Sequence, residues 1–298
     1  MTTSALARRE LARRLTRIGR ASVAQCLRSG LDARQLQAAA CIGFTGAPGV
    51  GKSTLIARVA AQRAGSGRRL AVIAIDPSSP RTEGALLGDR IRMDALLQSQ
   101  DVFIRSLASG QATDGMADNL AEVLAAVGAS GFDEMLLETV GVGQVEYGAR
   151  ALMDTAVLVL APGSGDQIQA MKAGTLETAD LLVVNKADQP GAARMAQDLR
   201  GVVELRRRAA HDWLPPVLQL AASDAASVHA LCEAIDAHAA WRAGHVDMEK
   251  VSQQRLLLHA KALLHRRLAE VSAGLDAQQR ALPLAALVEL LARRLQAP

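Results

Sequence analysis

The chain has 298 residues, of which 50% are hydrophobic, 21% charged and only 2% aromatic. This length allows one full α/β domain with additional segments, and the scarcity of aromatic side chains argues against a base-stacking surface for single-stranded nucleic acid. The net charge of +4 is too small to indicate a nucleic-acid partner, and no apolar run approaches the roughly 20 residues of a membrane-spanning helix.

Three cysteines, Cys26, Cys41 and Cys232, lie far apart and have no histidine at metal-ligand spacing. This usage is expected of a protein in a reducing cytoplasm and argues against structural zinc. The six histidines are also scattered, so a cluster that could receive nickel is not expected.

The N-terminal residues 5–39 read as helices with a break at Ser29–Gly30. The segment is rich in arginine, as organelle transit peptides are. Its leucines recur at helical spacing, however, and we interpret it as an ordinary amphipathic helix.

Short apolar runs alternate with helical stretches from residue 41 to residue 223, and this alternation predicts an α/β fold with a mostly parallel sheet covered by helices on both faces. The expected strands are 41–44, 70–75, 101–104, 133–137, 155–160, 180–184 and 216–220. The remainder is helical by pattern, with expected helices at 229–241, 255–273 and 283–295. We therefore expect three parts: an N-terminal helical segment (1–40), a nucleotide-binding domain (41–240) and a C-terminal helical extension (241–298).

A phosphate-binding loop of the Gly-x-x-x-x-Gly-Lys-Ser pattern follows the first expected strand and precedes a helix. Its glycines let backbone N–H groups approach a phosphate closely. Lys52 can reach the β- and γ-phosphates, and the Ser53 hydroxyl can hold Mg²⁺. The expected nucleotide-binding residues of this loop are Gly46, Ala47, Pro48, Gly49, Val50, Gly51, Lys52, Ser53 and Thr54.

Two later strands end in a carboxylate. Asp76 is placed near the phosphates if its strand neighbours the first strand, although an Asp at a strand end also serves as a helix cap. Glu138 stands where nucleotide switches carry the carboxylate that orients Mg²⁺, and Gly141 stands where a glycine N–H senses the γ-phosphate. Asp89 lies in a glycine-containing stretch that is a candidate switch segment.

The residue after Gly141 is Val142, where Ras-like switches carry the glutamine that orients the attacking water. An apolar side chain cannot orient water. We therefore expect slow intrinsic hydrolysis that another protein accelerates.

The base is predicted by the motif Asn185-Lys186-Ala187-Asp188, which follows an expected strand. The Asp188 carboxylate can accept from both N1–H and N2–H of guanine, whereas adenine offers an acceptor at N1. The Lys186 stem can pack over the base plane. The predicted nucleotide is GTP or GDP.

Together these motifs resemble the MeaB/ArgK family of P-loop GTPases, which includes the methylmalonic aciduria type A protein, over roughly residues 41–240. Resemblance implies that Asp76, Asp89 and Glu138 join Ser53 in an acidic Mg²⁺ shell. Electrostatic stabilisation of the γ-phosphoryl group by Mg²⁺, Lys52 and the loop amides is the expected mechanism. Asp76 and Asp89 are alternatives for positioning the attacking water.

The same resemblance implies a partner. Family members act as chaperones that gate cofactor loading of an adenosylcobalamin-dependent acyl-CoA mutase and protect or reactivate it, so cobalamin is expected only through the mutase. A homodimer formed by the C-terminal helices is also implied, and an adenosyltransferase is a further expected partner.

Some features of the chain depart from the family or leave a choice open. The guanine-backing turn, a Ser-Ala pair in the family, reads Ala221-Ala222 and is followed by Ser223, so one side-chain contact is absent. The segment 161–172 resembles an extra switch loop of the family. Its Lys172 is a nucleotide or partner contact, or equally a solvated surface lysine.

Three other functions are alternatives. A kinase linked to amino-acid transport would use ATP, which Asp188 disfavours. A nickel-insertion GTPase would need paired cysteines or clustered histidines. A translation or signalling GTPase is disfavoured by Glu138 and by the Asp76-Pro77-Ser78-Ser79 run.

Overall fold

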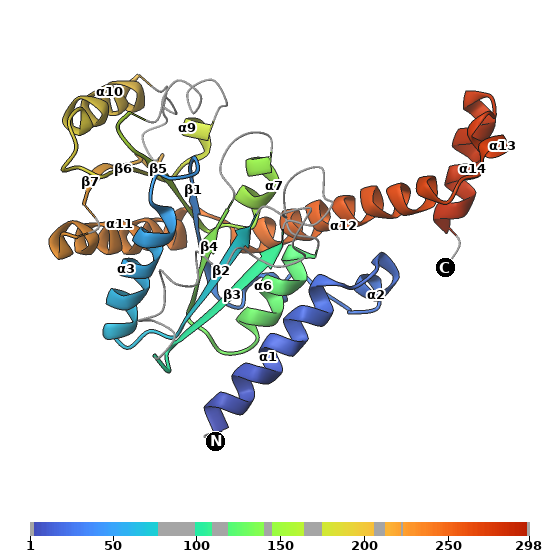
Figure 1. Ribbon diagram of the computed structural model, residues 1–298, viewed down its shortest axis with the longest axis horizontal. Helices are drawn as coiled ribbons and strands as arrows, with labels where there is room; N and C mark the ends of the chain where they lie inside the picture. The colour runs from blue at the N-terminus through green and yellow to red at the C-terminus, as the bar shows by residue number, and fades with distance from the viewer. Residues whose placement is uncertain are drawn as a thin grey trace.

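The structure is a computed structural model that describes residues 3–76, 99–108, 119–139, 145–163, 175–205, 212–221 and 223–296. Within these residues a seven-stranded sheet forms the centre of the molecule (Figure 1), and every strand pair in it is parallel. The strands are β1 (Ala40–Thr45), β2 (Leu70–Asp76), β3 (Val102–Ala108), β4 (Glu134–Glu138), β5 (Thr155–Leu160), β6 (Leu181–Asn185) and β7 (Val217–Leu220). Their order, β3-β2-β4-β1-β5-β6-β7, confirms the expected α/β class.

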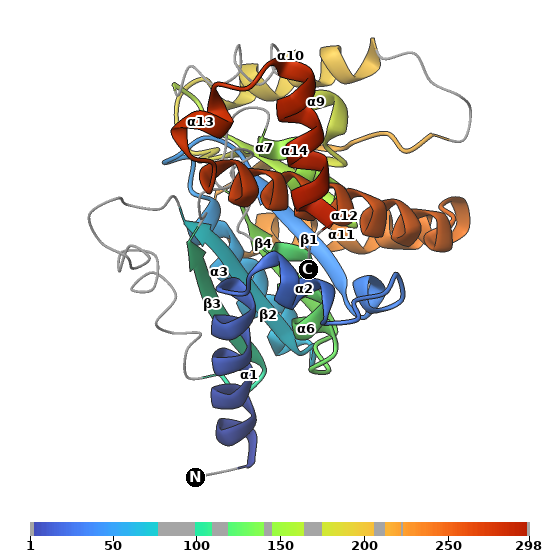
Figure 2. The same cartoon turned by 90° about the vertical axis from the view of Figure 1, so that its right-hand side faces the viewer.

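Helices cover both faces of the sheet (Figures 1 and 2). They are α1 (Thr3–Gly19), α2 (Val23–Leu27), the 3₁₀ turn η1 (Gln35–Gln37), α3 (Lys52–Gly65), α6 (Leu120–Gly128), α7 (Val145–Ala151), α9 (Thr175–Thr178), α10 (Ala192–Glu204), α11 (Ala225–His245), α12 (Met248–Ala273), α13 (Ala277–Arg280) and α14 (Leu284–Gln296).

Alternation along the strands divides the core between the two faces. On β5, Val157 and Val159 pack with α3 and α11, whereas Leu158 and Leu160 pack with α9 and α10. Helices α1 and α6 cover the same face as α10, over the other half of the sheet. Because strands buried on both faces are apolar throughout, the strands appear in the sequence as continuous apolar runs.

The N-terminal segment is less helical than the pattern predicts. Helix α1 ends at Gly19, and Ser22 starts α2 with a capping box, in which its side chain accepts from the Gln25 backbone and its own N–H donates to the Gln25 side chain. The interruption at residues 20–22 therefore comes from a cap signal that leucine spacing conceals. The expected turn at Gly30 is present, with φ at +69°.

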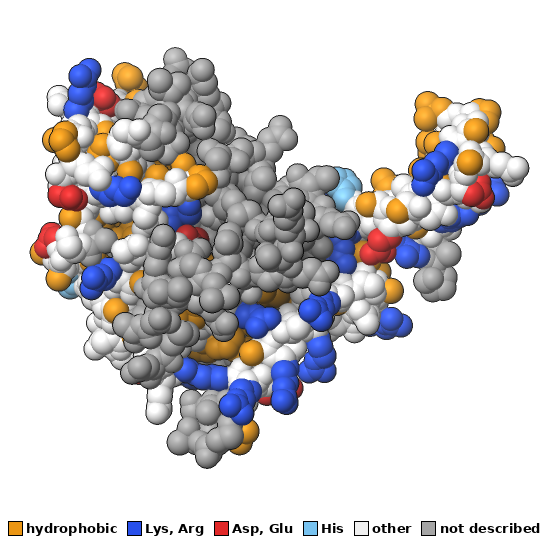
Figure 3. Space-filling view, viewed as in Figure 1, with side chains coloured by type: hydrophobic (Ala, Val, Ile, Leu, Met, Phe, Trp, Pro, Cys, Tyr) orange, Lys and Arg blue, Asp and Glu red, His pale blue; other side chains and the backbone are white. Residues whose placement is uncertain are grey.

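The C-terminal helices form an arm that projects from the sheet domain (Figure 1). Helix α12 begins at Met248, earlier than the pattern predicts, because the Asp247 side chain accepts from the N–H groups of Glu249 and Lys250. Figure 3 shows hydrophobic side chains exposed along the arm and at its tip. The exposed large apolar residues of these helices are Leu257, Leu258, Leu264, Leu268, Leu282, Leu284 and Val288. Among the described helices, none is both long and apolar enough to cross a bilayer.

Candidate nucleotide-binding site

The loop between β1 and α3 takes a conformation that only glycine accommodates. Gly46, Gly49 and Gly51 have φ angles of +139°, +81° and +96°. A Cβ on Gly46 would lie 2.1 Å from the backbone oxygen of Val159, and one on Gly51 would lie 2.5 Å from Nδ2 of Asn185. Glycine is therefore required here both by backbone angle and by space.

Lys52, the first residue of α3, turns its side chain back over this loop. Its ammonium group is buried and donates to the backbone oxygens of Gly46 at 2.7 Å and Ala47 at 3.1 Å. The contacts hold a positive charge at the loop, beside the N-terminus of α3. A helix N-terminus and an ammonium group both favour an anion.

Ser53 and Glu138 meet at the end of the sheet. The Ser53 hydroxyl donates to Oε1 of Glu138 at 2.8 Å, and both side chains are buried. The register of β1 and β4 produces this contact, because Phe44 pairs with Glu138. Hydroxyl and carboxylate oxygens are the ligand types that Mg²⁺ prefers, so the residues present fit that ion.

The strand of Asp76 does not neighbour the first strand. Strand β4 lies between β2 and β1, and Ala74 of β2 pairs with Glu138. Strand β2 therefore ends with Asp76 at the same edge of the sheet as Glu138. Asp76 lies one strand further from the phosphate loop than it would if β2 neighboured β1. The Asp76 side chain lies outside the described residues, as do Asp89, Gly141, Val142, Lys172 and Ala222.

The guanine motif is attached to the phosphate loop. Nδ2 of the buried Asn185 donates to the Val50 oxygen at 2.8 Å, and Nζ of Lys186 donates to the Gly49 oxygen at 2.9 Å. Sequence reasoning gave Lys186 a role at the base and missed both contacts. They follow from the strand order, which places β6 two strands from β1.

The remaining base residues lie on two adjoining turns. Asp188 is exposed, and the N–H of Ala187 donates to the Leu220 oxygen at 2.9 Å, which joins this turn to the end of β7. Ala221 and the exposed Ser223 follow directly on β7. The structure thus brings the loop, Lys52, Ser53, Glu138 and both base turns to one edge of the sheet.

Within the part of the chain that the structure describes, no group of three or more His, Cys, Asp or Glu side chains could hold a metal ion. Cys26, Cys41 and Cys232 are buried and not disulfide-bonded.

Comparison with known proteins places the chain in a family. Residues 12–275 match the family model described as methylmalonyl Co-A mutase-associated GTPase MeaB. A putative GTPase of Caulobacter vibrioides is 46% identical over 179 residues, which are 59% of this chain and 55% of that protein. The mitochondrial methylmalonic aciduria type A homolog of Mus musculus is 36% identical over 184 residues, 61% of this chain and 44% of that protein. The matched region thus spans about half the length of these relatives.

A solved structure supports the fold. The crystal structure of an LAO/AO transport system kinase superposes with a TM-score of 0.66 at 23% identity and covers 99% of this chain and 98% of that one. With the family match extending over most of its length, the chain belongs to the MeaB family of P-loop GTPases.

Proposed function

We propose that the chain binds GTP and GDP at the 46–53 loop and hydrolyses GTP with Mg²⁺. The observation that carries the proposal is the 2.8 Å hydrogen bond between Ser53 and Glu138, which joins the first turn of α3 to the end of β4. A buried carboxylate beside the loop serine has a clear use where a divalent cation must be held against phosphate oxygens.

Each residue has a role in this proposal. Lys52 and the loop N–H groups stabilise negative charge on the γ-phosphoryl group as water attacks. Ser53 and Glu138 would hold Mg²⁺, which supplies further stabilisation of phosphate charge when bound. Asp76 or Asp89 positions the water. With Val142 following Gly141, we propose slow hydrolysis by the isolated chain.

Guanine is the proposed base. Asp188 is exposed at the sheet edge that carries the loop, where its carboxylate can accept the two N–H groups of guanine. Asn185 and Lys186 hold the base turn against the loop through Val50 and Gly49. The absence of a side-chain hydroxyl at Ala221 weakens this binding rather than changing its specificity.

Calorimetric titration with GTP, GDP and ATP tests the nucleotide assignment. We expect GTP and GDP to bind with Mg²⁺ and ATP to bind at least about tenfold more weakly, because its base leaves Asp188 unpaired. Lys52→Ala should abolish most of the binding, while Lys250→Ala, on the exposed part of α12, should not. Tight ATP binding would favour a kinase instead, and normal binding by Lys52→Ala would refute the site.

Single-turnover GTP hydrolysis tests the catalytic roles. Glu138→Gln should reduce the hydrolysis rate more than the affinity for GTP, because the substitution leaves Lys52 and the loop unchanged. A fast rate from the isolated wild-type chain would contradict the role assigned to Val142.

The proposed partner is an adenosylcobalamin-dependent acyl-CoA mutase, methylmalonyl-CoA mutase or a relative, whose cofactor loading the chain gates and which it protects or reactivates. The family description and the name of the mouse relative support this choice. An adenosyltransferase that supplies the cofactor is a second proposed partner. Cobalamin itself is bound by these partners.

We further propose that residues 241–298 form a homodimer, since the arm carries exposed leucines on α12 and α14. Helix α11 runs through the proposed start of this part.

Buried free thiols suit a reducing compartment, and the cytoplasm is the proposed location.

Purified methylmalonyl-CoA mutase tests the chaperone proposal. The chain with GTP should slow the loss of mutase activity during turnover, and Lys52→Ala should not. Equal inactivation rates with and without the chain would exclude that mutase as partner.

Size-exclusion chromatography with light-scattering detection tests the homodimer. The chain should elute with the mass of a dimer, and the mass of a monomer would refute the role of the arm.

A further inference from the structure

The guanidinium group of Arg150 joins three parts of the chain. Arg150 lies in the last turn of α7. Its Nη2 donates to both carboxylate oxygens of Asp180 at 3.0 and 2.9 Å, its Nε donates to the Thr178 oxygen at 2.7 Å, and its Nη1 donates to the Met153 oxygen at 3.1 Å. One side chain thus binds α7 to the end of α9 and to the residue before β6.

Helix α7 begins at Val145, seven residues after Glu138 at the nucleotide edge. A small cavity of about 20 Å³ lies against Arg150 and is also lined by Thr45, which precedes the phosphate loop, and by Thr139, which follows Glu138. A space of this size holds about one water molecule. Arg150 therefore lines the same small cavity as Thr45 and Thr139, the residues next to the phosphate loop and next to Glu138.

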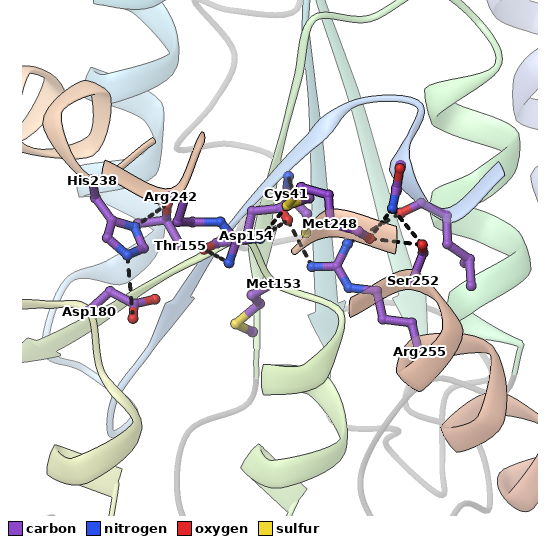
Figure 4. A network of polar contacts seen from close by, with 12 residues as sticks. Cys41, Met153, Asp154, Thr155, Asp180, His238, Arg242, Met248, Ser252 and Arg255 are labelled. Carbon is purple, nitrogen blue, oxygen red and sulfur yellow. Dashed lines mark hydrogen bonds and ion pairs between the residues drawn. The ribbon is translucent and has the colours of Figure 1, made fainter. Parts of the chain in front are cut away.

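Asp180 also contacts Ala156 on β5, Trp213 and His238. Its Oδ2 accepts from the Ala156 N–H at 2.7 Å, and its backbone oxygen accepts from the indole N–H of Trp213 at 2.7 Å. Oδ1 lies 3.6 Å from Nε2 of the buried His238, which Figure 4 shows beside it. Burial lowers the pKa of His238 more than the Asp180 carboxylate raises it. The His238 ring beside Asp180 is therefore uncharged.

Both tryptophans of the chain belong to this cluster. The Trp213 ring lies 4.9 Å from the His238 ring and 5.8 Å from the Trp241 ring, centroid to centroid. The chain contains no other tryptophan. Its intrinsic fluorescence consequently reports on the surroundings of Asp180.

The base of the arm attaches to the same turn. Nε of Arg255 on α12 donates to the oxygen of Ala151, the last residue of α7, at 2.9 Å, and its Nη2 donates to Asp154 at 2.9 Å (Figure 4). A displacement of α7 would therefore act on the Asp180 cluster through Arg150 and on the arm through Ala151.

We propose that Arg150 is a positioning residue that couples the nucleotide state of the site to the Asp180 cluster and the base of the arm. The proposal rests on the proposed binding of GTP and GDP. In it, the difference between the GTP and GDP states reaches Arg150 through Thr45 and Thr139, which line the same cavity, and the hydrogen bonds of the guanidinium group make Thr178 and Asp180 move with α7. Coupling of this kind is reciprocal, so loss of the fork must also change the preference for GTP over GDP.

Tryptophan emission of the full chain tests the coupling. The wild type, saturated with a non-hydrolysable GTP analogue or with GDP in the presence of Mg²⁺, should give two different spectra. Arg150→Gln should lose this difference, and the ratio of its dissociation constants for GDP and the analogue should change by about fivefold or more. Arg293→Gln, an exposed arginine of α14, is the matched control and should retain both.

A purely structural role predicts another result. It would lower the melting temperature of Arg150→Gln and leave the nucleotide-dependent difference in emission intact, which would overturn the proposal. If Arg150→Gln does not fold, Arg150→Lys replaces it, because lysine keeps the charge beside Asp180 but cannot bind Thr178 and Met153 together. An unchanged difference in tryptophan emission between the two nucleotide states of Arg150→Lys would also count against the proposal.

The two proposals fail differently. If calorimetry shows that wild type binds both nucleotides and the two spectra coincide, the coupling is refuted and the GTP site stands. If neither nucleotide binds, the proposed function fails, and the coupling fails with it.

Discussion

Replacing Asp154 by asparagine should loosen the attachment of the C-terminal helices to the sheet. Oδ1 of Asp154 accepts from Nη2 of Arg242 and from Nη2 of Arg255, each at 2.9 Å, and its Oδ2 accepts from the Cys41 N–H at 2.8 Å (Figure 4). One carboxylate thus links β1 to α11 and α12.

The cost follows from the burial of its partners. The side chain of Arg255 is 3% exposed and that of Arg242 is 12% exposed. Burial lowers the pKa of Arg242, although the Asp154 charge acts in the opposite direction. Breaking a buried ion pair from one side costs about 3–5 kcal/mol. Because asparagine keeps one oxygen acceptor, we expect the lower end, about 3 kcal/mol, which corresponds to a fall in melting temperature of about 6–12 °C.

Urea unfolding of the nucleotide-free chain, followed by circular dichroism, measures this loss. Asp198→Asn on the exposed face of α10 is the matched control and should change the free energy of unfolding by less than about 0.5 kcal/mol. A loss below about 1 kcal/mol in Asp154→Asn would refute the reasoning, because it would place this pair in the class of solvent-exposed ion pairs.

Three further predictions concern the phosphate loop, the stability of the fold at acid pH and the reactivity of two cysteine thiols. Gly46→Ala should abolish nucleotide binding, because its Cβ would lie 2.1 Å from the Val159 oxygen; calorimetry with GTP checks this, and wild-type affinity would contradict the loop geometry. Burial alone raises the pKa of Glu122, but the hydrogen bond and charge of His259 outweigh it and bring the pKa below 4.5, so its contribution to stability is present above that pH and is lost as the pH falls through the folded-state pKa. Glu122→Gln should therefore flatten the loss of melting temperature in acid, and an unchanged acid profile would argue against this pair. Cys26 and Cys41 should resist alkylation by iodoacetamide at about pH 8 in the folded chain, because burial raises the pKa of each to about 12; rapid labelling seen by mass spectrometry would show that the thiols are accessible.

Most strands were predictable because a strand buried on both faces is a continuous apolar run. The run at 155–160 coincides with β5, the run at 70–75 ends one residue before β2 does, and the run at 133–137 is shifted by one residue from β4. Helix boundaries were less predictable, since they depend on single caps. Asp247 starts α12 seven residues before the expected helix, and Ser22 divides a segment whose leucine spacing suggests continuity.

At the site, residues near one another in the sequence were easier to place than residues brought together by topology. The loop glycines and Lys52 follow from local pattern, and their geometry agrees with it. Strand order is not encoded locally, so the insertion of β4 between β1 and β2 could not be foreseen. The contacts of Lys186 and Arg150 were missed for the same reason.

The position of β1 has a consequence for biosynthesis. This strand leads into the phosphate loop, yet its two neighbours begin at Glu134 and Thr155. As the chain leaves the ribosome, β1 has no pairing partner until residues 134–138 have been made. Parallel sheets closed by such distant pairings form slowly and expose apolar strand edges on the way. Nascent chains of this protein should therefore depend on holding factors at the tunnel exit until β4 and β5 emerge.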